Sequence, residues 1–297
     1  MRYFLSILLV IILGSVSVFA QVPSRTPPLG LLNLQQPVNP FHPQARGLQN
    51  WWRVLPGRFG GSIWYDLMNQ GNGTLTNMTV VDTSGWGNTS RFGGNGEMRF
   101  DGTDDRVVPP CGCIANLTAF TIMGWIKSSQ SSTTQYLYQE QNDSTIAQVA
   151  FGFNEDFSGD LTAFNLDDAS AAWTTQVTGL NPTDGQWHHV AVVQSSKSAA
   201  AMYFDGIQVA TASATIGTVT TQGRSIGSRR DGTAPFNGSI DDVRVYTRAL
   251  AADEIVAVYR DAQQGEPTLL TRLFPVTLRP DSRSSFMPFF RLDGTRQ

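Results

Sequence analysis

The side chains best suited to general base catalysis or zinc binding are three histidines, and two of them, His188 and His189, are adjacent. They lie in a segment, 187–193, whose alternating pattern predicts a β-strand. Because neighbouring strand residues point to opposite faces, the two rings cannot converge on one ion or substrate. His42 stands apart in a proline-rich stretch. We therefore expect the histidine pair to be packing residues.

Paired carboxylates, which a glycosidase needs on either side of the sugar bond, are not indicated by the sequence pattern. None of the five glutamates has an acidic residue two positions away. Asp101, Asp104 and Asp105 lie together in what looks like a turn. The motif H-E-x-x-H does not occur, and the one G-x-S-x-G match, Gly223 to Gly227, coincides with an expected short strand, 225–227, rather than with the strand-to-helix turn of a nucleophile elbow. We therefore predict no catalytic residues and no enzymatic activity. The five glutamates are Glu97, Glu140, Glu155, Glu254 and Glu266.

The two cysteines, Cys111 and Cys113, are separated by a single glycine. A closed zinc site needs four ligands, so this pair alone is too sparse for one. The spacing favours a pair of cysteines that is either oxidised or without a functional role over a metal site.

The first twenty residues resemble a secretory signal peptide: Arg2 precedes an apolar run, 4–18, and Val18-Phe19-Ala20 offers a cleavage site. The alternative is an uncleaved anchor, but the run is shorter than the ~20 residues that span a bilayer. No later segment is long and apolar enough to span. We expect a secreted or cell-surface protein without a stable membrane span once residues 1–20 are removed.

Composition supports an extracellular all-β protein. Without the signal, 297 − 20 = 277 residues remain, with a net charge of 20 − 24 = −4. That length is enough to bury a core without disulfides or metals. Charged residues make up only 15% of the chain, below the ~25% of average domains. Lysines and arginines do not cluster into the basic groove that nucleic acid requires, so nucleic acid is not an expected partner.

Proline content divides the chain into parts. Residues 21–46 contain six prolines and are interpreted as a linker or as a segment draped on the domain. The globular domain is expected over 47–264. Residues 265–297 carry more arginine than acidic residues, with apolar clusters and four prolines. They are either an arm packed on the domain or a docking segment for a partner.

Within 47–264 the pattern predicts strands and hairpins. Residues 120–127 alternate with apolar side chains on both faces, as in a strand inside a sandwich. Residues 202–204 and 207–209 flank Asp205-Gly206, which favours a two-residue hairpin turn. Only 251–262 has helical spacing. The predicted fold is all-β: an antiparallel two-sheet β-sandwich of the jelly-roll type with one short C-terminal helix.

Seven short motifs follow one another over about residues 47–262. They are Gly47-Leu48-x-x-Trp51-Trp52 with Trp64-Tyr65-Asp66, Phe100 to Asp105, Phe120 to Trp125, Gly185 to Ala191, Tyr203-x-Asp205-Gly206, Ile226-Gly227, and Gly238-x-Ile240 to Tyr246. In this order they resemble the laminin-G-like, concanavalin-A-like lectin/glucanase jelly rolls. Such domains include lectins, adhesion modules, enzymes and structural appendages, so the resemblance implies the fold and leaves the function open.

The resemblance also implies a calcium site, because members of this family often carry calcium near the sandwich edge. The matching ligands here are Asp66, Asn72 and Asp241. A second loop, Asp82 to Asn88, matches the sequence pattern of the family's calcium loop better, but it lacks the Gly-Thr-Leu that follows the loop of Asp66 and Asn72. Calcium takes oxygen ligands, which these side chains offer. Alternatively, Asp66 caps a turn and Asp241 pairs with a neighbour such as Arg244 or Arg248.

The function expected from these features is a secreted, non-enzymatic binding module for a glycan or a cell-surface protein, with calcium as a candidate cofactor. Trp86, Trp173, Tyr136 and Tyr138 are candidate sugar-stacking residues, and loops 133–145 and 154–175 the candidate surface. The alternatives are a structural or adhesive appendage that assembles through 265–297, and an atypical glycoside hydrolase.

Overall fold

The chain divides into two compact units, 1–34 and 35–297, and all residues described below lie in the second. The predicted signal peptide and the C-terminal tail lie outside the described residues. The computed structural model describes residues 38–39, 41–55, 60–79, 84–87, 96–110, 113–141, 148–153, 160–166, 172–177, 179–213 and 223–263.

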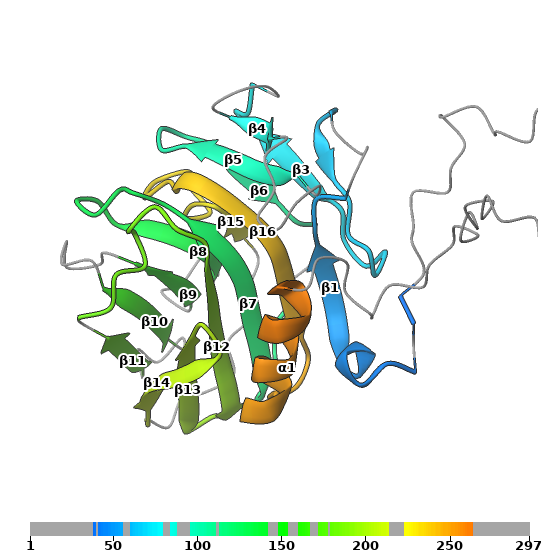
Figure 1. Ribbon diagram of the computed structural model, residues 1–297, viewed down its shortest axis with the longest axis vertical. Helices are drawn as coiled ribbons and strands as arrows, with labels where there is room; N and C mark the ends of the chain where they lie inside the picture. The colour runs from blue at the N-terminus through cyan, green and yellow to red at the C-terminus, as the bar shows by residue number, and fades with distance from the viewer. Residues whose placement is uncertain are drawn as a thin grey trace, which may run out of the picture. The chain divides into compact units, whose positions relative to one another are not determined.

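Two antiparallel sheets form the domain, which confirms the predicted all-β sandwich (Figure 1). The first sheet consists of β1 (Leu48–Trp52), β4 (Gly85–Gly87), β5 (Glu97–Asp101), β7 (Phe120–Lys127), β12 (His188–Ser196), β13 (Ala199–Phe204), β14 (Ile207–Ala212) and β16 (Asn237–Tyr246). Its order is β14-β13-β12-β7-β16-β5-β4, and β1 also pairs with β16.

The second sheet has the order β11-β10-β9-β8-β15-β6-β3-β2, so strands distant in sequence lie side by side. Its strands are β2 (Ile63–Trp64), β3 (Gly73–Thr76), β6 (Arg106–Val108), β8 (Gln135–Gln141), β9 (Gln148–Phe153), β10 (Leu161–Leu166), β11 (Ala172–Val177) and β15 (Gly223–Ile226).

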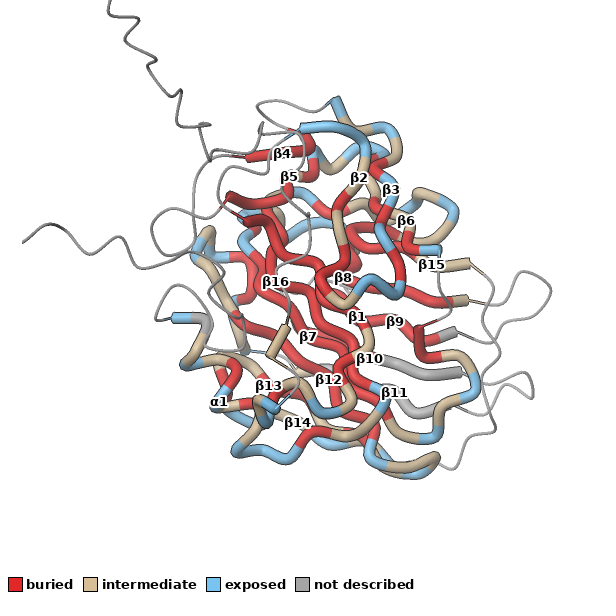
Figure 2. The backbone as a smooth tube through the Cα atoms, turned by 90° about the vertical axis from the view of Figure 1, so that its right-hand side faces the viewer, coloured by how far each residue is buried: buried red, intermediate tan, exposed pale blue. Residues whose placement is uncertain are grey.

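Strand β7 shows how the sequence builds both faces of the first sheet. Phe120, Ile122 and Ile126 belong to the main hydrophobic cluster of the sandwich. Met123 belongs to a second cluster and Trp125 contacts the helix, so both lie on the opposite, outer face. The two-faced apolar pattern predicted for this strand is confirmed, and buried residues run along the centre of both sheets in Figure 2.

Helix α1 (Ala252–Gln263) covers the outer face of the first sheet (Figure 1). Its Ile255 and Val258 are buried in the second cluster. Tyr259 stacks on Trp125, with ring centroids 5.6 Å apart and an interplanar angle of 17°. The helix lies one residue further along the chain than its helical spacing predicts. In the described part of the chain, no helix is long and apolar enough to cross a membrane.

The described end of the proline-rich segment is draped on the domain, one of the two arrangements expected for it. A short 3-10 helix, Pro43–Ala45, buries Gln44. The amide oxygen of Gln44 accepts a hydrogen bond from Nη1 of Arg244, at 3.2 Å. Val38 packs against the second hydrophobic cluster. The folded unit therefore begins before Gly47.

The hairpin of β13 and β14 has the predicted two-residue turn. Asp205 and Gly206 both have positive φ, 49° and 79°, as a type I′ turn requires. A Cβ at Gly206 would also meet the ring of Tyr259 at 3.0 Å. Glycine is thus required here by the backbone conformation, and the helix packs closely against it.

Candidate functional site

Asp66 is a buried carboxylate that organises the loop after β2. It is 2% exposed and forms an isolated β-bridge with Trp52. Both carboxylate oxygens accept hydrogen bonds from β1 and from the loop that follows. The donors are Trp51 N (2.7 Å) and Met68 N (3.0 Å) to Oδ1, and Asn50 Nδ2 (2.8 Å), Gln70 N (2.9 Å) and Gly71 N (2.9 Å) to Oδ2.

These contacts bear on the predicted calcium ligands. The structure brings Asn72 to Asp66, because the amide oxygen of Asn72 accepts from the Asp66 N–H at 3.0 Å. Asp241 binds elsewhere, accepting from the N–H of Val54, two residues beyond the end of β1, at 2.9 Å. A carboxylate has about four lone-pair sites, and five N–H donors already surround Asp66. This arrangement does not fit a calcium ligand. The alternative role expected for Asp66, a turn cap, fits better, and calcium there stays an untested prediction.

The basic residues of the closing segment have acidic partners of their own. Arg244 forms a buried ion pair with Asp242, at 2.9 Å between Nε and Oδ1. Arg248 pairs with Glu254, at 2.6 Å between Nη2 and Oε1. Burial alone would lower the pKa of Arg244, but the charge of Asp242, the interaction with Tyr246 and the hydrogen bonds to both together outweigh it, so the pKa of the guanidinium is raised. These pairs stabilise the closing strand and the helix.

Three of the aromatic residues predicted to stack on sugars are buried. Trp86 is 8% exposed and donates its Nε1–H to the carbonyl of Gly61 at 2.8 Å. Tyr136 and Tyr138 are 5% and 0% exposed. None of these rings offers a free face to a ligand. The side chain of Trp173, and loop residues 142–147, 154–159 and 167–171, lie outside what the structure describes.

Trp187 is the one tryptophan that is not buried among those whose side chains are described. It immediately precedes β12 and forms no hydrogen bond or ring contact with other described residues. Asp184 and Gln186 beside it are exposed. Gly185, with φ of 83°, donates its N–H to the carbonyl of Ser128 at 2.8 Å. The turn is thereby fastened to the β7–β8 connection and presents an aromatic ring with polar neighbours.

The predicted strand over 187–193 begins one residue too early, because β12 starts at His188 and Trp187 lies in the turn before it. A signal was present nevertheless, because residues 181–185, Asn-Pro-Thr-Asp-Gly, have the composition of a turn that ends just before Trp187. A residue in the turn before a strand is less covered by neighbouring strands than one in the middle of the strand.

His188 is bound on both ring nitrogens by carboxylates. Nδ1 lies 2.8 Å from Asp205 Oδ2 and Nε2 lies 3.1 Å from Asp184 Oδ1. Its ring stacks on Phe204 with centroids 4.6 Å apart. Burial alone would lower the pKa of His188, but the hydrogen bonds and charges of Asp205 and Asp184 outweigh it and raise the pKa. The cationic form is thus favoured, and a cation is a poor general base.

His189 points the other way, as expected for an adjacent strand residue. It is 1% exposed and lies against Trp125, 5.5 Å between ring centroids, and against Tyr259 of the helix. The two histidines therefore lie on opposite faces of the sheet, and neither position is suited to joint catalysis or zinc binding.

The described glutamates have structural partners. Glu97 pairs with Arg99 at 2.7 Å, and Glu254 with Arg248. Glu140 is fully buried, and its Oε1 accepts from Cys113 N (2.7 Å), Ile114 N (3.2 Å) and the Tyr138 hydroxyl. Cys113 is bonded in a disulfide. Glu155 and Glu266 lie outside the described residues.

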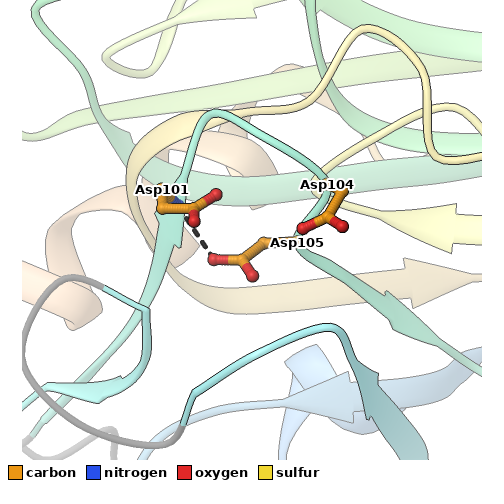
Figure 3. Close-up of side chains that lie close together, drawn as sticks. All are labelled: Asp101, Asp104 and Asp105. Carbon is orange, nitrogen blue, oxygen red and sulfur yellow. Dashed lines mark hydrogen bonds between the residues drawn. The ribbon is translucent and has the colours of Figure 1, made fainter.

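A group of three carboxylates lies in the turn between β5 and β6 (Figure 3). Asp101, Asp104 and Asp105 each place one oxygen within 4.8 Å of the others. Asp101 and Asp104 are exposed, whereas Asp105 is fully buried. The sequence pattern indicates a turn at these residues and gives no sign of a ligand.

The sandwich, its helix-covered sheet and its order of strands define a lectin-like jelly roll, and sequence comparison agrees. The family model described as "Concanavalin A-like lectin/glucanases superfamily" matches residues 101–256, just over half of the chain. The chain belongs to this superfamily. Comparison with curated protein sequences finds no match.

Solved structures with similar folds include the binding domain of Paraclostridial Mosquitocidal Protein 1 (TM-score 0.55, 13% identity, 72% of this chain and 52% of that chain covered). The botulinum neurotoxin serotype G binding domain is also similar, with a TM-score of 0.52 and 10% identity over 72% of this chain and 50% of that chain. The chain spans about half the length of these two. A third similar structure is domain 4 of AbnA, a GH43 extracellular arabinanase from Geobacillus stearothermophilus, solved in complex with arabinotriose. The TM-score is 0.53 and the identity 15%, and the match covers 71% of this chain and 98% of that chain.

Proposed function

We propose that the chain is a secreted, non-enzymatic module that binds a carbohydrate at the turn carrying Trp187. The observation that carries this proposal is that Trp187, which is only partly buried, directly follows a turn with exposed Asp184 and Gln186. An aromatic face packs against the C–H face of a sugar ring, and carboxylate and amide groups bond its hydroxyls. A ligand of this kind needs a fixed platform, which the Gly185–Ser128 hydrogen bond supplies.

The fold supports the same proposal. Domain 4 of the arabinanase was solved with a bound trisaccharide, and this chain matches nearly its whole length. The likeness concerns the fold, so the identity of the sugar is left to experiment. A protein at a cell surface is the other ligand class that a fixed aromatic turn could serve.

Catalysis is not part of the proposal, because the described glutamates have structural partners. Glu97 and Glu254 are held by arginines, and Glu140 by backbone N–H groups. A glycosidase needs one carboxyl group free to donate a proton and a second facing the sugar. An assay for released reducing sugar should therefore give no signal above background.

The experiment is a glycan array probed with the full chain. We expect retention on a restricted set of glycans and its loss in Trp187→Ala. Phe41→Ala is the matched control, because Phe41 is a 93% exposed aromatic residue outside this turn. Retention that is equal in Trp187→Ala and the wild type, or no retention on any glycan, would contradict the proposal.

A further inference from the structure

The turn between β5 and β6 concentrates negative charge. One oxygen each of Asp101, Asp104 and Asp105 lies within 4.8 Å of the other two (Figure 3). None of the three forms an ion pair within the part of the chain that the structure describes. Like charges at this separation repel, and burial of Asp105 reduces the screening by water. The turn therefore needs a compensating positive charge or a proton.

Backbone N–H groups hold two of the three side chains in place, those of Asp101 and Asp105. The Asp101 N–H donates to Asp105 Oδ2 at 2.9 Å, and the Thr103 N–H donates to Asp101 Oδ1 at 2.8 Å. Gly102 has φ of 76°, which allows the reversal. The Asp104 carbonyl accepts from Asn77 Nδ2 at 3.4 Å. The cluster is thus built into the turn and does not result from free movement of exposed side chains.

A second observation points to a ligand. The other oxygen of Asp105, Oδ1, is buried and has no hydrogen-bond partner. A buried polar atom left without a partner costs about 1–3 kcal/mol, and more when it is charged. Most buried side-chain oxygens in folded proteins have a partner, so this one calls for an explanation.

We propose that Asp101, Asp104 and Asp105 bind a calcium ion that fastens the β5–β6 turn. Calcium–oxygen distances of 2.3–2.6 Å allow two ligand oxygens to lie up to about 5.2 Å apart. The three oxygens lie within 4.8 Å of one another, so small rotations of the exposed Asp101 and Asp104 side chains bring all of them within reach of one calcium ion. Magnesium suits the turn less well, because it demands near-ideal octahedral geometry and gives up its waters reluctantly. Three carboxylates leave several positions to water, which predicts a dissociation constant of roughly 10⁻⁴–10⁻³ M, as in extracellular modules.

A protonated Asp105 is the competing explanation. Burial raises the pKa of this carboxyl, the hydrogen bonds from Ser84 and Asp101 N oppose the rise, and the charges of Asp101 and Asp104 add to it. An uncharged acid at this position would be mimicked by asparagine. The two explanations therefore differ in what Asp105→Asn does and in whether calcium changes stability.

The test is thermal unfolding of the full chain, with chelator and with increasing calcium chloride at constant ionic strength, and with magnesium chloride in parallel. Equilibrium dialysis with calcium counts the ions bound. The variants are Asp104→Asn, an exposed residue with little risk to folding, and Asp105→Asn. Asp253→Asn, an exposed position at the start of α1, removes the same charge elsewhere.

We expect calcium to raise the Tm of the wild type and of Asp253→Asn, with saturation at one ion per chain and a smaller effect of magnesium. Asp104→Asn should weaken calcium binding at least tenfold, and Asp105→Asn should abolish the shift. A wild type that does not respond to calcium, with Asp105→Asn at least as stable, would overturn the proposal in favour of the protonated acid. A calcium response unchanged in both variants would also overturn it. Neither result depends on glycan binding.

Discussion

The guanidinium of Arg244 lies over the indole ring of Trp51, 4.4 Å from its centroid. Arg244 lies on the closing strand β16 and Trp51 on the first strand β1, and both are fully buried. Asp242 joins them, because its Oδ1 accepts from Nε1 of Trp51 at 2.5 Å and from Nε of Arg244 at 2.9 Å. The two ends of the domain are thus connected by a buried charge pair and a cation–π contact.

Removal of the negative charge from this group should be costly. In Asp242→Asn, Arg244 stays buried without its counter-charge, so we expect the free energy of unfolding to fall by about 3–5 kcal/mol. The measurement is urea unfolding. Glu254→Gln is the matched control, since it breaks the partly exposed pair with Arg248 and should cost no more than about 1 kcal/mol. Equal losses of unfolding free energy in the two variants would show that the buried group contributes no more to stability than the partly exposed pair.

Asp66→Asn tests the role of Asp66. The amide replaces one acceptor oxygen by a donor, so N–H groups that now bond Oδ2 lose their partner, at about 1–3 kcal/mol each. We expect a loss of about 2–4 kcal/mol on that scale, equal in calcium and in chelator. Unfolding curves in the two buffers provide the measurement. If chelator brought the wild type down to the stability of Asp66→Asn, the calcium prediction at Asp66, Asn72 and Asp241 would be supported instead.

The stability of the fold should depend on pH through His188. Its folded-state pKa is raised above the ordinary value of 6.5, so its contribution is fully present below pH 6.5 and is lost as pH rises through the folded pKa. Each partly exposed pair, with Asp184 and with Asp205, contributes at most about 1 kcal/mol. Tm measured from pH 5.5 to roughly 8.5 should fall in the wild type more than in His188→Asn. Parallel curves would exclude this role.

Local sequence patterns predicted the fold, because strand alternation and turn composition reflect the conformational preferences of residues that are neighbours in the chain. The alternation of 120–127 and the Asp205-Gly206 turn depend on neighbouring residues alone, and both are confirmed. The candidate sites depend on contacts between distant segments. Asp66 receives donors from Asn50 and Trp51 of another strand, and these cannot be read from its own loop.

Exposure is likewise a tertiary property. Trp86 and Trp187 both stand in polar, glycine-containing stretches, yet one is buried and the other is half exposed. The cover over Trp86 comes from its packing against the core between the sheets, which the sequence around it does not specify. The sequence also does not show that Oδ1 of Asp105 is buried without a hydrogen-bond partner, because this depends on how the β5–β6 turn packs in the folded domain.

The most direct test of the account is titration calorimetry of the full chain with the glycan it retains most strongly. Loss of an aromatic stacking contact is worth about 1–3 kcal/mol by analogy with base stacking, so Trp187→Ala should weaken binding by roughly 5- to 150-fold. Phe41→Ala should bind like the wild type, and all three proteins should share the same Tm. Unchanged affinity in Trp187→Ala would contradict the placement of the binding site at this turn.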